Sequence, residues 1–335
     1  MPRLLRLTLS VAMAAGLLWL LISWSDVSAQ DLWTRWRSLS LTVWAGALAL
    51  HGGIYCLRSL RFGVLLSGEG QPGRGRLLAI SAAHNLAALM LPAKTGEAAL
   101  PLYLKRYCAV PISAGLASLV VSRLLDLALL CTILAGSSLW MSQSVDQAPA
   151  WMLPLSLALC AAAAFGFAVS ARADWLLAIF DRASRILGLR GTRVGARLDD
   201  LSRKTAESLR TAGGSGRLWR ATALSVPLWL GVFAFLGVLA TGFGLEHAHG
   251  LPGDTFGAAW SLLAQMLPIN VFAGAGTQEL GWVVGFGLLG VPEDLALETG
   301  LGVYTVYRLN VLLLGVLGHL AMALFGKTPA EHPGA

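Results

Sequence analysis

The sequence predicts an all-α polytopic membrane protein with about six transmembrane helices, two re-entrant hairpins and an inverted internal repeat. Of the 335 residues, 56% are hydrophobic and only 13% are charged, whereas a typical soluble domain has about 25% charged residues. Apolar runs of about 20 residues, which suffice to cross about 30 Å of hydrocarbon, recur from end to end. Two further apolar stretches are interrupted near their middles by Pro, Gly and charged residues.

We expect residues 1–335 to form a single integral-membrane domain. The interrupted stretches 77–106 and 256–288 are expected to enter and leave the membrane on one side. Non-helical backbone at that depth is tolerated only where protein or water satisfies its polar groups. The alternative is a layout of seven or eight crossings, in which the hairpins pass fully through. The six expected crossings lie at about 4–24, 40–60, 112–138, 151–171, 218–242 and 297–324.

The basic residues predict an orientation with both termini in the cytoplasm. The net charge is +7, and many of the cations fall in a polar linker at 172–217, while the expected outer loops 139–150 and 243–255 contain no Lys or Arg. This asymmetry follows the positive-inside rule, so nucleic acid is not an expected partner. The linker's apolar spacing predicts amphipathic helices on the inner leaflet, and a partner-docking site is the alternative. In this layout Arg58 and Arg61 belong to a cytoplasmic flank.

The two interrupted stretches resemble each other. Each contains a break rich in Gly or Pro, then a Glu, a Val-Pro pair and an Arg inside the next apolar run. The repeats cover about 40–138 and 218–324. Because the crossings before the hairpins are the second and the fifth, the two units are expected to run in opposite directions. Paired, interrupted segments of inverted halves are the best sequence pointer to the central site of a transporter.

Charged residues in or beside these segments form the candidate site. Six charged residues are involved: Lys94, Glu97, Arg123, Asp126, Glu279 and Arg308. If unpaired in the membrane, at about 2.5–3.5 kcal/mol each, they would cost on the order of 15–20 kcal/mol. This cost exceeds the net stability of about 5–15 kcal/mol that is typical of a protein. They should therefore face one another, water or a charged ligand. Helix starts at the breaks, with Thr95 as an expected cap, favour phosphate. The expected substrate-binding residues are Lys94, Thr95, Gly96, Glu97, Arg123, Asp126, Gly274, Gly276, Thr277, Glu279 and Arg308.

Two alternatives concern these charges. Arg123 and Asp126, three apart on one helical face, could be an internal ion pair that holds helices together. The expected site contains three cations and three carboxylates, so a bound phosphate would make it negative and favour proton uptake by Glu97 or Glu279. In the alternative, both carboxylates stay paired with arginine and transport is passive.

The sequence contains no nucleophile motif, nucleotide site or metal-ligand spacing, so we expect no catalytic residue, cofactor or metal.

The same residues resemble those of a known family, the lysylphosphatidylglycerol synthase transmembrane-region (flippase-like) family. The resemblance covers about 5–325 and implies translocation of an anionic or phosphate-bearing lipid, such as a phospholipid, a polyprenyl-phosphate or a hopanoid-type lipid, across a bacterial inner membrane. An enzyme or accessory subunit of lipid or glycolipid biosynthesis is the alternative. A homo-oligomer or a biosynthetic partner protein is also open. The matching residues are Pro92, Gly96, Glu97, Arg123, Asp126, Gly274, Gly276, Glu279 and Arg308.

Overall fold

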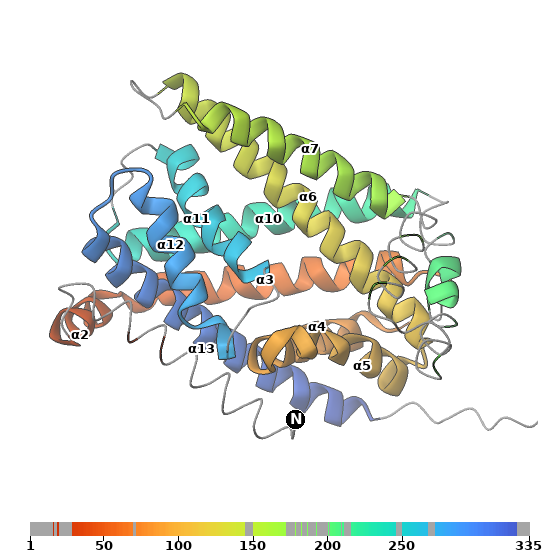
Figure 1. Cartoon of the computed structure of the whole chain (residues 1–335). Helices are drawn as coiled ribbons and strands as arrows, with labels where there is room; N and C mark the ends of the chain where they lie inside the picture. The colour runs from red at the N-terminus through yellow and green to blue at the C-terminus, as the bar shows by residue number, and fades with distance from the viewer. Residues whose placement is uncertain are drawn as a thin grey trace, which may run out of the picture.

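Figure 1 shows the computed structural model of the chain, a set of helices packed side by side. Within the residues that it describes, all regular structure is helical and no strand occurs, which confirms the predicted fold class. The first expected crossing at 4–24 and most of the linker at 172–217 lie outside these residues. Apart from single positions, the described ranges are 29–69, 72–144, 150–171, 202–208, 216–245, 250–266 and 272–326.

After a short helix, α2 (Ala29–Ser38), two sets of helices follow in the same order. The paired helices have nearly equal lengths: 25 and 26, 17 and 17, 10 and 11, and 33 and 33 residues. The first half consists of α3 (Leu41–Leu65), α4 (Arg74–Met90), η1 (Pro92–Ala98), α5 (Ala99–Cys108) and α6 (Ile112–Ser144). The second half consists of α10 (Arg217–Gly242), α11 (Gly250–Met266), η2 (Phe272–Gly274), α12 (Thr277–Gly287) and α13 (Glu293–Phe325). Between the halves, α7 (Met152–Ala171) packs along α6 (Figure 1).

The first helices of the two halves lie side by side and run in opposite directions (Figure 1). Gly242, at the end of α10, lies against Val43 at the start of α3. At the other end, Arg61 Nη1 of α3 donates to Ser225 Oγ of α10 at 2.9 Å. This antiparallel contact is what an inverted repeat requires of its leading helices, although the repeat itself stays a prediction.

Four of the described helices are long and apolar enough to cross a membrane: α6, α7, α10 and α13. They correspond to four of the six expected crossings, which supports a multi-pass membrane protein. The expected crossing at 40–60 corresponds to α3, whose 25 residues span about 37 Å at 1.5 Å per residue. The helix is less apolar because it contains His51, Arg58 and Arg61, and it continues to Leu65 instead of ending near residue 60.

Each interrupted stretch forms a pair of helices joined by a short 3₁₀ segment. The second members, α5 and α12, have 10 and 11 residues and so extend only about 15 Å, half of the hydrocarbon thickness of about 30 Å. A helix of this length cannot cross by itself, which fits the expected hairpins. Their path relative to a membrane remains a prediction.

Both hairpins depend on a glycine at a very close backbone contact. A Cβ atom at Gly96 would lie 2.0 Å from the carbonyl oxygen of Ala87, and one at Gly285 would lie 2.2 Å from the carbonyl oxygen of Gly257. No other residue fits at either place without movement of the backbone. The largest apolar core lies beside the second hairpin, where Trp282, Phe286 and Tyr304 pack together among α11, α12 and α13.

Candidate functional site

An ion pair joins the first break to the long helix that follows it. Arg123 Nη2 of α6 donates to Glu97 Oε1 at 2.6 Å, and Arg123 Nε donates to Oε2 at 3.3 Å. His84 Nε2 of α4 lies 3.3 Å from the same Oε2 atom. The side chains of Arg123 and Glu97 are 42% and 21% exposed, so this pair of predicted residues is accessible to a ligand.

The corresponding pair in the second half is enclosed. Arg308 Nη1 of α13 donates to Glu279 Oε1 at 2.7 Å, and the two side chains are 18% and 0% exposed. Arg308 Nε donates to the carbonyl of Ala273 at 3.0 Å, and Arg308 Nη2 donates to Gln278 Oε1 at 3.2 Å. Arg308 therefore bonds three residues of the second break at once. These hydrogen bonds hold the second break against α13.

The main partner of Asp126 lies on α3, a helix to which the sequence analysis assigned no site residue. Arg61 Nη1 donates to Asp126 Oδ1 at 2.6 Å and Arg61 Nη2 to Oδ2 at 3.2 Å. Trp229 Nε1 of α10 also donates to Oδ1, at 3.0 Å. The Arg123 guanidinium lies farther away, 3.5 Å from Oδ2. The alternative of an ion pair between Arg123 and Asp126 is therefore present, but as the longer contact of each residue: Arg123 binds chiefly Glu97, and Asp126 binds chiefly Arg61.

Arg58 and Arg61, which the sequence analysis placed on a cytoplasmic flank and outside the site, are packed against neighbouring helices next to the predicted site residues. The Arg61 side chain is only 1% exposed, and Arg58 Nη1 donates to Asn85 Oδ1 of α4 at 2.9 Å. One signal could have revealed this, because four apolar or small residues follow Arg61, from Phe62 to Leu65. That run continues the helix beyond both arginines.

Both breaks contain a residue with a positive φ angle. Lys94 and Gly276 each precede the Glu of their hairpin by three residues, and both have positive φ angles, 59° and 82°. The cap of α5 is Ala98, not Thr95 as expected. At α12, Gly276 N–H donates to Glu279 Oε2 at 2.8 Å. The start of α12, predicted to bind an anion, is thus already bound by the protein's own carboxylate.

The remaining glycine and threonine positions of the predicted site support the second break. Gly274 has a φ of 67°, and Thr277 Oγ1 donates to its carbonyl oxygen at 3.0 Å. A side chain is tolerated poorly at such a φ angle, which accounts for glycine there. These residues shape the break, and their assignment to substrate binding stays a prediction.

A chain of polar contacts connects the two hairpins. The Lys94 ammonium, at the first break, donates to the carbonyl oxygen of Gln265 at the C-terminal end of α11. Gln265 Nε2 donates to the Tyr307 hydroxyl of α13 at 3.1 Å, and the Tyr307 ring stacks on His51 of α3 with 5.6 Å between centroids. The two hairpins therefore contact each other.

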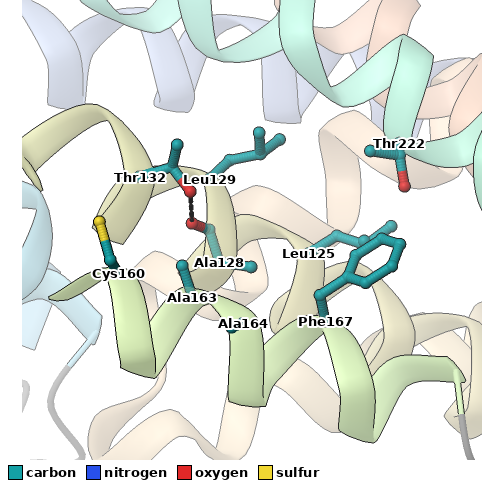
Figure 2. A pocket seen from close by; sticks show the side chains of 9 residues that line it. All are labelled: Leu125, Ala128, Leu129, Thr132, Cys160, Ala163, Ala164, Phe167 and Thr222. Carbon is teal, nitrogen blue, oxygen red and sulfur yellow. Dashed lines mark hydrogen bonds between the residues drawn. The ribbon is translucent and has the colours of Figure 1, made fainter. Parts of the chain in front are cut away.

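An apolar cavity of about 340 Å³ lies on another face of α6, between α6, α7 and α10 (Figure 2). Its two hydroxyl groups, of Thr132 and Thr222, donate to carbonyls of their own helices. The cavity thus offers no free polar group to a head group, and its chemistry suits hydrocarbon. It is lined by Leu125, Ala128, Leu129, Thr132, Cys160, Ala163, Ala164, Phe167 and Thr222.

Comparison with known proteins agrees with these observations. A search of curated proteins gave no match. A scan against protein families matched residues 5–318 to the lysylphosphatidylglycerol synthase TM region, which includes every charged residue described above. The match covers nearly the whole chain, so this protein belongs to the lysylphosphatidylglycerol synthase transmembrane-region family.

Proposed function

We propose that this protein carries a phosphate-bearing or otherwise anionic lipid from one leaflet of the inner membrane to the other. The observation that supports this most directly is the open Glu97–Arg123 pair at a broken hairpin. A guanidinium binds phosphate through charge-assisted N–H groups, and the Arg123 side chain is 42% exposed. The lipid would be a phospholipid, a polyprenyl-phosphate or a hopanoid-type lipid.

The physical task of such a protein is to lower the cost of moving a charged head group through hydrocarbon. Without compensation, an isolated ion in a medium of low dielectric costs tens of kcal/mol. A head group that binds beside the Glu97–Arg123 pair would be attracted by the Arg123 guanidinium while Glu97 keeps its own partner, and the acyl chains would remain in the surrounding lipid. The antiparallel leading helices suggest a site that could open alternately to either side.

We propose further that both termini are cytoplasmic and that the linker at 172–217 lies on the inner leaflet. The basic composition of this linker favours contact with anionic lipids. We propose no catalytic role. Chemical change of the lipid, self-association or docking of a biosynthetic partner are the alternatives that an experiment should separate.

The test uses the purified chain in liposomes with phosphatidylglycerol that carries a fluorophore on one acyl chain. Bleaching of outer-leaflet fluorophores measures movement, and mass spectrometry of the same lipids detects chemical change. We expect faster movement than in protein-free liposomes, unchanged lipid mass, and a loss of at least about tenfold in Arg123→Gln, since a hydrogen bond to a charged group contributes about 1.5–3 kcal/mol.

The matched control is Lys105→Gln, which removes a cation from the exposed end of α5. This variant should move lipid at the parent rate. Folded parent protein that accelerates no lipid would contradict the proposed function. A change in lipid mass would favour the enzyme alternative.

A further inference from the structure

The charges at the centre of the molecule do not balance. Six of these charged residues form three ion pairs: Arg61 with Asp126, Arg123 with Glu97, and Arg308 with Glu279. Two more cations, Arg58 and Lys94, have no carboxylate within ion-pair distance among the described residues; their hydrogen bonds go to Asn85 and to the carbonyl of Gln265. The group therefore has an excess of two positive charges.

Both unpaired cations belong to the first half and lie near its open pair. Arg58 interacts electrostatically with Arg123, Asp126 and Arg61, and Lys94 interacts with Arg123 and Glu97. The Nε atoms of Arg58 and Arg61 are buried without a hydrogen-bond partner. Donors of this kind are costly when buried, so they indicate that an acceptor is missing from this region.

We propose that Arg58, Lys94 and Arg123 bind the head group of a lipid phosphomonoester that carries two negative charges. This inference rests on the proposed function and specifies its substrate class. A phosphate monoester has a charge of about −1.5 to −2 at pH 7, which matches the excess of two. A phosphodiester carries one charge and would leave one cation unpaired, and a cationic aminoacylated lipid would add to the excess.

A purely structural role for the two cations is the competing explanation. Arg58 bonds Asn85, whose Nδ2 donates to the Tyr55 hydroxyl at 2.7 Å, and this chain ties α3 to α4. Lys94 bonds the C-terminal end of α11, where a cation is favoured by the helix dipole. These contacts satisfy hydrogen bonds, but neither supplies a full negative charge. The two explanations therefore differ in whether charge at residue 58 affects which lipid is bound.

The experiment compares two lipids that differ by one charge. The full chain, in nanodiscs of phosphatidylcholine, is titrated at pH 7.5 with dioleoyl phosphatidic acid or with dioleoyl phosphatidylmethanol, in which one phosphate oxygen is methylated. We expect the parent protein to bind phosphatidic acid at least about tenfold more tightly. Arg58→Gln should reduce this preference to less than about threefold, whereas Arg58→Lys should retain most of it.

Two further variants separate charge from structure. Lys105→Gln removes a cation outside the group and should keep the full preference. Asn85→Ala breaks the Arg58–Asn85 bond but leaves the charge, so it should keep the preference too. A similar loss in Asn85→Ala and Arg58→Gln would favour the structural explanation and overturn the inference. If Arg58→Gln does not fold, Lys94→Gln replaces it, with the same expected loss.

Equal binding of the two lipids by the parent protein would also overturn the inference. That result would leave the proposed function intact if phosphatidylglycerol still moves between leaflets in liposomes. Failure of every lipid to move would instead contradict the proposed function, whatever the binding preference.

Discussion

The two halves of this protein have the same order of helices but use their Glu–Arg pairs differently. In the second half, Glu279 is fully buried, caps α12 and is bound by Arg308, which also bonds Ala273 and Gln278. In the first half, Arg123 is 42% exposed, and the nearby cations Lys94 and Arg58 have no carboxylate within ion-pair distance in the part of the chain that the structure describes. A shared architecture thus contains one closed pair and one open pair. We interpret the closed pair as structural and the open pair as functional.

The largest expected effect comes from removing the charge of each Glu in turn. Glu279→Gln leaves Arg308 uncompensated in an enclosed site, which should reduce the free energy of unfolding by about 3–5 kcal/mol. Glu97→Gln affects a partly exposed pair and should reduce it by about 1 kcal/mol. Thermal unfolding in one detergent compares the two variants, with Glu293→Gln as the exposed control. Equal losses would remove the distinction between closed and open pairs.

A smaller effect should be common to both halves, because each hairpin has a glycine at a close contact. Gly96→Ala and Gly285→Ala should each reduce the free energy of unfolding by about 1–3 kcal/mol, the usual cost of overpacking. Gly136, in the middle of α6, has no atom within 4 Å of its position for a Cβ. Gly136→Ala should therefore leave stability unchanged or increase it by about 0.5–1 kcal/mol. Tolerance of alanine at only one hairpin would show that the halves also differ in packing.

The sequence predicted the second half of the site better than the first. Glu279 and Arg308 pair as the motif suggested, because each lies in an apolar segment where a charge requires a partner. Arg58 and Arg61 were missed because basic residues at the end of an apolar run are typical of a cytoplasmic flank. Their burial depends on Asp126 and Asn85, which belong to other helices. Such tertiary partners cannot be identified from one sequence without a structure.

The sequence also did not predict that the Glu97–Arg123 pair is more exposed than the Glu279–Arg308 pair. Glu97 and Glu279 have similar sequence surroundings, each after a break that contains glycine. What differs is the local hydrogen bonding: Gly276 N–H binds Glu279, while His84 approaches Glu97 from α4. The positive φ angle of Lys94 also had no sequence signal, since lysine rarely adopts it.

Lys94 offers a more moderate test, because the second half has glycine at the corresponding position of its break. Lys94→Gln removes one cation beside Arg123 but retains a side-chain donor for the carbonyl of Gln265. We expect lipid movement to fall by roughly three- to tenfold, with a change in unfolding free energy of about 1 kcal/mol or less. Liposome transport and thermal unfolding measure the two effects. A large loss of stability with normal transport per folded molecule would indicate that Lys94 only joins the hairpins.

The smallest expected effect is that of pH on transport, and it follows from the revised charge count. Three cations and three carboxylates led to the hypothesis that a bound phosphate forces Glu97 or Glu279 to take up a proton. Arg58 and Arg61 raise the sum to two positive charges, so an anionic head group can bind while both carboxylates remain ionised and paired with arginine. Movement of phosphatidylglycerol, whose diester does not titrate in this range, should vary less than about twofold between about pH 5.5 and 8.5.

Phosphatidic acid is the matched control: its movement should increase toward higher pH, as its phosphate loses a second proton near about pH 6. A tenfold pH effect on phosphatidylglycerol that disappears in Glu97→Gln or Glu279→Gln would restore proton coupling, and the variant responsible would identify which half of the protein carries the proton.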